Sequence, residues 1–358
     1  MNVLVDRHHA GLLYSLQLLF EDRLGLDLYI PIGSQWWDLG VWQFGKGYGD
    51  DRLAQQYLSI NNAELILGLD EATPAREAVE GDGHYVLRDM AEYPERDIRC
   101  VTMEQYKNLG EWAYVVATVP DNAPGFATLA KYSGAKFVYQ VGNHNQLIDW
   151  TLNPIVLSSS EADLRGSTKA VAIHQEFEKD TVFRYRPPSY TYQDRCSTGS
   201  FVNCFNRIPR ELGYWTETRD ILDPYGWCFA MHGSDGDDGK VGPCATLADK
   251  IAEFGFGWHD KPHGDGFGHV IHYLASVGRP LVGNAANYKG LFAEGLWEDG
   301  VTAVDTGKRS PAETAEILRD IASDPDIHNE MCKAIRERVD TLCDFDAEEL
   351  LVRDVLGL

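Results

Sequence analysis

Apolar positions along the first half of the chain follow two different periods. Short apolar runs bounded by polar residues or glycine predict buried strands, and an apolar stripe with helical spacing over 12–24 predicts a helix that ends at Gly25. The strands predicted in this half span 2–5, 26–31, 64–69, 114–120, 136–142 and 155–160, and a further helix spans 126–134. Strands that alternate with helices favour a parallel sheet with right-handed crossovers. The first half therefore predicts a doubly wound α/β domain.

A second alternating series begins after Pro187 and Pro188, which interrupt the pattern and predict a linker. Its strands are predicted at 200–205, 227–233, 279–284 and 301–305, its helices at 245–255 and 269–277, and residues 312–356 are mostly helical by period. The recurrence predicts the α/β fold class, with two Rossmann-like domains that face each other across a cleft. We place these domains at 1–185 and 186–335. In such sheets ligands bind beyond the carboxyl ends of the strands.

Acidic residues outnumber basic residues, with 55 Asp and Glu against 32 Lys and Arg over 358 residues, and the formal net charge is −23. A field of this sign repels phosphate backbones, which excludes a nonspecific polybasic nucleic-acid binder. Hydrophobic residues make up 44% of the chain, which excludes a disordered acidic tail. The local exception is 181–210, whose arginines leave a confined contact with nucleic acid open: Arg184, Arg186, Arg195, Arg207 and Arg210.

The cysteines and the apolar runs bear on the compartment. Seven cysteines are scattered without a CxxC pair, which argues against a disulfide scaffold or a cysteine zinc site and favours a reducing cytoplasm. No apolar run approaches the ~18 residues of a membrane helix, and residues 1–9 lack the apolar core of a signal peptide. We therefore expect a cytoplasmic protein without a membrane partner.

Residues 259–280 carry the strongest chemical pattern. A glycine-rich turn, with Gly264, Gly266 and Gly268, leads directly into the helix predicted at 269–277. Glycines let a backbone approach a ligand closely, and the N–H groups at a helix start attract phosphate or carboxylate. A simple tight turn in which Asp265 caps the helix is the structural alternative. A metal site is the less favoured one because no HExxH-type signature accompanies the nearby histidines: His259, His263, His269 and His272.

This segment resembles the nucleotide-sugar-binding half of GT-B glycosyltransferases, which commonly contains the block E-G-F-G-x-x-x-x-E-A-x-A-x-G-x-P-V. Without a gap, residues 265–281 match it at Gly266, Phe267, Gly268, Gly278 and Pro280, with Asp265 and Leu281 as conservative replacements. The resemblance implies that Asp265 contacts the transferred sugar and that the backbone at 266–269, including His269, meets the donor diphosphate. Tyr273 stands where the family has the acid that holds the ribose.

The resemblance extends to the start of each domain. In GT-B enzymes a basic residue after the first strand of the second domain clamps the diphosphate, which implies this role for Arg207 and Arg210 and removes the need for a metal. The loop after the first strand of the first domain often holds a catalytic group, which implies a general base at His8 or His9. The resemblance also implies that a C-terminal helix, 336–358, packs back on the first domain. Both regions are similar to glycosyltransferases encoded by bacteriophages.

Two further segments bear on the acceptor and on metals. An aromatic stretch between glycines, 33–49, is predicted to stack on a sugar or a nucleobase through Trp36, Trp37 and Trp42, with a hydrophobic plug as the alternative. The acids of 235–238 predict a solvated loop rather than a metal motif.

Taken with the resemblance, these features lead us to expect a hexosyltransferase that uses a UDP- or GDP-sugar without a metal cofactor. 5-Hydroxymethylcytosine in phage DNA is a candidate acceptor. The alternatives are a glycan or small-molecule acceptor, a non-catalytic nucleotide-sugar-binding protein and an epimerase.

Overall fold

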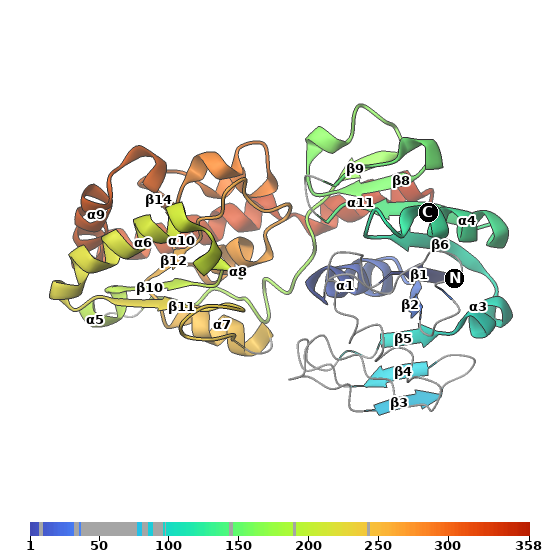
Figure 1. Cartoon of the computed structure of the whole chain (residues 1–358), viewed down its shortest axis with the longest axis horizontal. Helices are drawn as coiled ribbons and strands as arrows, with labels where there is room; N and C mark the ends of the chain where they lie inside the picture. The colour runs from blue at the N-terminus through green and yellow to red at the C-terminus, as the bar shows by residue number, and fades with distance from the viewer. Residues whose placement is uncertain are drawn as a thin grey trace. The chain divides into compact units, whose positions relative to one another are not determined.

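The computed structural model describes residues 1–6, 10–31, 36, 77–80, 85–88, 96, 98–142, 146–188, 191–241 and 244–358. The chain forms two compact units, each with its own sheet (Figure 1). The N-terminal unit comprises Met1–Phe177 together with Phe345–Leu358, and the C-terminal unit comprises Glu178–Asp344. The units change at 177/178 and 344/345, whereas the sequence placed the changes at 185/186 and 335/336.

The sheet of the N-terminal unit is mostly parallel, with antiparallel pairing only along β3–β4–β5 among its described strands. In spatial order its described strands are β3 (Glu77–Glu80), β4 (Tyr85–Arg88), β5 (Ile98–Val101), β2 (Asp27–Pro31), β1 (Asn2–Val5), β6 (Trp112–Ala117), β7 (Lys136–Gln140), β8 (Ile155–Ser158) and β9 (Ala170–Ala172). Its helices are α1 (Ala10–Gln17), which continues as the π-helix η1 (Leu18–Arg23), then α3 (Met103–Leu109), α4 (Ala123–Ser133) and α11 (Phe345–Leu356), with short 3-10 turns η4 (Trp150–Leu152) and η5 (Glu161–Asp163).

Both faces of this sheet are covered, as alternation along β1 shows. Val3 and Val5 lie in a core cluster with residues of α1, η1 and α11, whereas Leu4 lies in a second cluster with residues of α3 and α4. Successive side chains of a strand point to opposite faces, and a parallel strand covered on both faces is apolar throughout. This arrangement explains the uninterrupted run NVLV, from which the sequence correctly predicted the strand. The strand predicted at 64–69 lies outside the described residues.

The sheet of the C-terminal unit is parallel throughout its described strands, in the order β11-β10-β12-β13-β14. Its strands are β10 (Ser197–Ser200), β11 (Cys228–Met231), β12 (Phe256–Trp258), β13 (Leu281–Gly283) and β14 (Ala303–Asp305). Its helices are α5 (Tyr192–Arg195), α6 (Pro209–Leu222), α7 (Cys244–Ala252), α8 (His269–Val277), α9 (Pro311–Ser323) and α10 (Pro325–Leu342), with 3-10 turns η6 (Phe205–Arg207), η7 (Asp223–Tyr225), η8 (Ala285–Tyr288), η9 (Phe292–Leu296) and η10 (Thr306–Lys308). The α/β fold class predicted from the sequence is thus confirmed.

The strand predicted at 200–205 was wrong, because the inner strand β10 is Ser197–Ser200 and 201–205 have left the sheet. Its sequence STGS has a single β-branched residue, Thr198, and none of the large apolar or aromatic residues that mark a strand. Packing explains the choice: a Cβ at Gly199 would lie 2.5 Å from the ring of Phe254, so the small strand makes room for that ring. Across the described ranges, no helix has both the length and the apolar character to cross a membrane.

Candidate functional site

The glycine-rich turn follows β12 at the carboxyl edge of the C-terminal sheet, where ligands of such sheets bind. His263, Gly264 and Gly268 all have positive φ, at 66°, 65° and 74°. A Cβ at Gly264 would lie 2.5 Å from the carbonyl oxygen of Asn287, so this position requires glycine for space as well as for φ. The turn ends at α8, whose bounds agree with the predicted helix at 269–277.

Asp265 is held by two donors from the segment that leads into the turn. Nε2 of His259 lies 3.0 Å from Asp265 Oδ2, and the Lys261 ammonium pairs with Asp265 Oδ1. The exposed fractions of the side chains are 2% for His259, 17% for Asp265 and 41% for Lys261. Burial opposes ionisation of Asp265, but the hydrogen bond and charge of His259 and the charge of Lys261 together lower its pKa below the usual range. Asp265 is therefore a firmly held anion.

The start of α8 has no side-chain cap. Its N-cap residue is Gly268 and not Asp265, so the structural alternative of an Asp265 cap is wrong. The Asp265 carboxylate nevertheless lies near this helix start, with Oδ2 3.7 Å from the position that a Cβ of Gly268 would take. A helix start presents N–H groups and about half a positive charge. The turn thus combines a held anion with a helix start whose N-cap residue, Gly268, provides no side-chain cap.

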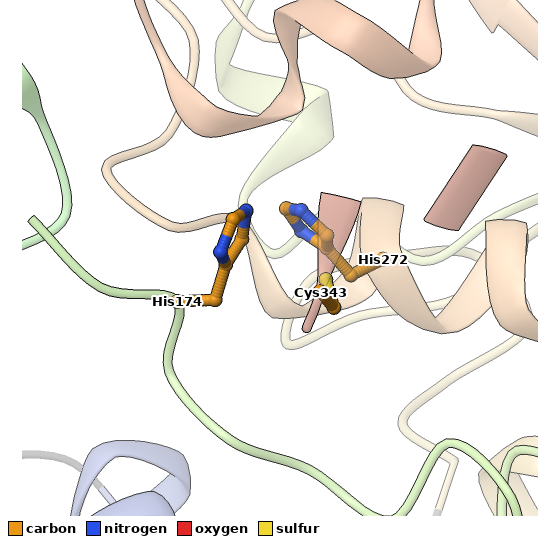
Figure 2. A group of neighbouring side chains, drawn as sticks. All are labelled: His174, His272 and Cys343. Atoms are coloured by element: carbon orange, nitrogen blue, oxygen red, sulfur yellow. The ribbon is translucent and has the colours of Figure 1, made fainter. Parts of the chain in front are cut away.

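His272 supports the turn from within the core of the unit. The side chain is fully buried, Nδ1 donates to the Gly268 carbonyl at 3.0 Å, and the ring stacks on Phe267 with centroids 4.1 Å apart. A ligand atom of His272 also lies within 4.8 Å of the Cys343 sulfur, just after α10 (Figure 2). His174, labelled in the same figure, belongs to the N-terminal unit and contacts Glu348 there.

Tyr273, at the position of the family's second acid, faces away from solvent. Its hydroxyl lies 3.2 Å from Nδ1 of His269, and its ring stacks on Phe183 with centroids 3.8 Å apart. The side chain is 5% exposed. Tyr273 therefore contacts the turn indirectly, through the ring of His269.

The two arginines predicted to bind the donor follow β10, the strand next to β12. Arg207 ends η6, is 74% exposed, and places Nε 3.0 Å from Asp235 Oδ2. Arg210 lies exposed in the first turn of α6. Asp238, in the same acidic loop as Asp235, accepts from the Met231 N–H at 2.7 Å. Two acids of this loop thus have specific partners.

The arginines of 181–210 do not share one exposed surface. Arg195 is 4% exposed and donates to the Ala322 carbonyl at 2.8 Å, so it belongs to the core. Arg186 pairs with Asp249. The positive surface charge of 181–210 is therefore smaller than the number of arginines in the sequence indicates.

Asp6 is the buried acid of the N-terminal unit, directly after β1. β1 leads on to β2 on one side and pairs with β6 on the other, so Asp6 lies at the point where the strand order reverses. Thr118 donates to Oδ1 through its N–H at 2.7 Å and its hydroxyl at 2.6 Å, and Asn122 donates to Oδ2 at 2.8 Å. Burial raises the pKa of Asp6 to about 6, against the opposing effect of these hydrogen bonds.

The remaining predicted residues of this unit fare differently. His8, His9, Trp37 and Trp42 lie outside the described residues. Trp36 is fully buried, donates to the Val101 carbonyl at 3.3 Å and packs edge-on against Tyr106. Its ring has no surface free to stack on an acceptor, and we correct the predicted role to a core residue.

Sequence reasoning missed His259, Lys261 and Asp6 as partners in these sites. His259 was considered only as a metal ligand, and Lys261 was overlooked. The four-residue spacing of Lys261 and Asp265 was the available signal, but the intervening residues form a turn with positive φ at His263 and Gly264, so spacing alone did not predict the contact.

Comparisons with known proteins concern the fold. No protein-family model matches the sequence, and neither does any curated protein. A variant of S. aureus TarM in complex with fondaparinux, alpha-GlcNAc-glycerol and UDP is similar in structure, with a TM-score of 0.60, 8% identity and 100% of both chains covered. Anabaena HepE with UDP and glucose has a TM-score of 0.57 and 13% identity, with 98% of both chains covered.

An alpha-glucosyltransferase in complex with UDP and a 13-mer DNA containing an HMU base is also similar. Its TM-score is 0.59 at 8% identity, with 100% of both chains covered. At these identities the likeness shows the fold alone. The GT-B fold class predicted from the resemblance is thereby confirmed.

Proposed function

We propose that this protein is a glycosyltransferase that moves a sugar from a nucleoside-diphosphate sugar to an acceptor hydroxyl. The observation that carries the proposal is the Gly264–Gly268 turn, which joins an uncapped helix start to the held carboxylate of Asp265. Full-length likeness to solved structures that contain UDP supports it. In the transfer the acceptor oxygen bonds to the anomeric carbon as the bond from that carbon to the diphosphate breaks.

The roles of the donor-site residues follow from their chemistry. N–H groups at 266–269 bind the diphosphate, and the exposed Arg207 and Arg210 offset the charge of the leaving group. Arg207 exchanges Asp235 for phosphate on binding. Asp265 accepts from a hydroxyl of the transferred sugar, and Tyr273 acts on the donor indirectly by fixing the ring of His269. His8 or His9 serves as the base toward the acceptor.

Two classes of acceptor have support among the similar structures. The alpha-glucosyltransferase bound to DNA supports a hydroxymethylated base, and TarM with alpha-GlcNAc-glycerol supports a glycan-type hydroxyl. We favour hydroxymethylcytosine DNA as the first acceptor to test. A net charge of −23 requires any such contact to be local and sensitive to salt.

The direct test incubates the purified protein with a set of UDP- and GDP-sugars and DNA that contains hydroxymethylcytosine, followed by digestion to nucleosides and mass spectrometry. A hexose-sized mass gain is expected on the modified base. A gain on alpha-GlcNAc-glycerol instead would assign the glycan acceptor. If the protein neither binds any of these donors nor transfers a sugar from one, the proposed function is contradicted.

Variants locate the donor site in the same assay. Arg207→Ala should reduce transfer at least tenfold through weaker donor binding. Arg219→Ala is the matched control, because Arg219 is an exposed arginine in the same unit that pairs with a neighbouring acid, Asp220. Equal activity of the two variants would move the donor site away from Arg207.

A further inference from the structure

Lys261 is the one movable member of the group that holds Asp265. Its side chain is 41% exposed, whereas Asp265 and His259 are 17% and 2% exposed. A lysine is a compact charge on a flexible stem and can change partners without moving the backbone. His259 is fixed at the end of β12, where its carbonyl accepts from the Tyr288 hydroxyl at 3.3 Å. Of the two donors to Asp265, Lys261 is the one that can leave.

The ion pair brings this ammonium close to the start of α8. Asp265 Oδ2 lies 3.7 Å from the position of a Cβ on Gly268, the N-cap residue, and Lys261 contacts the other oxygen of the same carboxylate. The helix start and the ammonium therefore converge on Asp265 from different sides. An anion at the helix start lies within reach of the lysine.

Charge balance favours such an exchange. In the empty site the negative charge of Asp265 is already offset by Lys261 and by the contact with His259. A diphosphate brings about two negative charges next to the Asp265 carboxylate, and like charges at close range repel. A cation shared between the carboxylate and the phosphate removes that repulsion without a further group.

We infer that Lys261 is a phosphate ligand of the donor, held by Asp265 in the empty site and shared with the diphosphate when the donor binds. This inference rests on the proposed function. As the shared ammonium turns toward the phosphate, Asp265 Oδ1 can also accept from a hydroxyl of the sugar, while Oδ2 stays bonded to His259. Lys261 thus couples arrival of the diphosphate to exposure of the carboxylate that orients the sugar.

The test measures binding of UDP to the full chain by calorimetry, or of GDP if the wild type prefers it. Lys261→Gln should weaken binding at least tenfold at low salt and flatten its salt dependence. Lys261→Arg keeps the charge and should stay within about threefold of the wild type. Lys250→Gln is the matched control, since Lys250 is 34% exposed and pairs with a nearby acid, Glu253, at 2.7 Å. The corresponding nucleoside, which lacks phosphate, should bind all four proteins equally.

The variant Asp265→Asn distinguishes two roles for Lys261, that of a phosphate ligand and that of a residue that only holds Asp265 in place. This variant frees Lys261, so UDP should bind at least as tightly as to the wild type while sugar transfer falls. If Asp265→Asn loses UDP affinity as Lys261→Gln does, or if Lys261→Gln keeps it, or if Lys261→Arg loses it as fully as Lys261→Gln, the inference is overturned. A wild type that binds neither nucleotide contradicts the proposed function itself, which distinguishes the two failures.

Discussion

At the scale of single residues, the structure separates side chains of similar sequence character by what surrounds them. Asp265 and Asp6 both follow the end of a parallel strand at the carboxyl edge of its sheet. The pKa of Asp265 is lowered because His259 and Lys261 outweigh its burial, whereas burial prevails at Asp6 and raises the pKa to about 6. The first is therefore an anion at all working pH values, and the second titrates near neutrality.

Asp6 should make the stability of the protein depend on pH in a defined window. Its pKa rises from 3.8 to about 6 on folding, so the folded state binds the proton more tightly. The associated stability is complete below pH 4, falls as the pH rises from about 4 to 6, and is absent above, a change of about 3 kcal/mol. Asp6→Asn removes this titration, so urea unfolding should show its free energy relative to wild type rising across that window. A constant difference from pH 4 to 7 would contradict the raised pKa.

Residue identities were more predictable from the sequence than residue contacts. Asp265 and the glycines around it were found because a motif preserves their order along the chain. Lys261 was missed because the residues between it and Asp265 form an irregular turn, where spacing alone does not predict a contact. Trp36 was misplaced because an aromatic residue between glycines reads alike on a surface loop and in a core.

At the scale of elements, periodicity correctly predicted helices that bury an apolar stripe and strands that bury an apolar run. Helix α8 and strand β1 fell where the pattern placed them. The inner strand β10 lies earlier in the chain than predicted, because its small residues make room for the ring of Phe254 and form no apolar run. The predicted helix at 12–24 changes to a π-helix at Leu18, and the six residues of this π-helix are too few for the changed period to show in the apolar stripe.

Replacement of His272, on helix α8, should weaken donor binding as well as lower stability. His272→Phe keeps a ring against Phe267 but removes the donor to the Gly268 carbonyl, and we expect the KM for the donor to rise about tenfold with kcat within threefold. His328→Phe is the matched control, because His328 is equally buried and bonds the Gly255 carbonyl at 2.9 Å. Both variants should lower the Tm. Equal KM values in the two would reduce His272 to a purely structural role.

Arg23, at the end of the π-helix η1, joins α11 to the first segment of the N-terminal unit. Nε of Arg23 lies 2.7 Å from Glu176, and Nη1 lies 2.7 Å from Asp346 and 3.4 Å from Glu349 on α11. Burial raises the pKa of Glu176, and Arg23 opposes that rise.

Arg23→Ala should therefore lower the free energy of unfolding by about 1–3 kcal/mol at pH 7, because Glu176 loses its cation in a partly buried place. The loss should shrink at pH 5, where Glu176 takes up a proton more readily. Urea unfolding followed by circular dichroism measures it. Arg219→Ala, which breaks an exposed pair, should stay within about 0.5 kcal/mol of the wild type.

At the scale of the whole molecule, the two units differ in how the chain builds them. The C-terminal unit is one continuous segment, Glu178–Asp344, and it contains every residue that we place in the donor site. The N-terminal unit is discontinuous, because Phe345–Leu358 returns to it after the other unit is complete. The returning α11 supplies Val352 and Leu356, both fully buried in the core cluster with α1. We therefore expect the C-terminal unit to fold when expressed alone, whereas residues 1–177 lack α11 and should be less stable.

The segment 178–344 expressed alone should fold cooperatively and bind UDP or GDP with a Kd within about tenfold of the full chain. Residues 1–177 alone should unfold at lower urea, because burial of a large apolar side chain stabilises by about 1.5–3 kcal/mol and α11 supplies three, Phe345, Val352 and Leu356. Adding a peptide of residues 345–358 should restore part of that loss, since binding to the folded state stabilises it. Circular dichroism melts and calorimetry measure each step. Nucleotide binding by the full chain but not by a folded 178–344 would mean that the N-terminal unit contributes to the donor site.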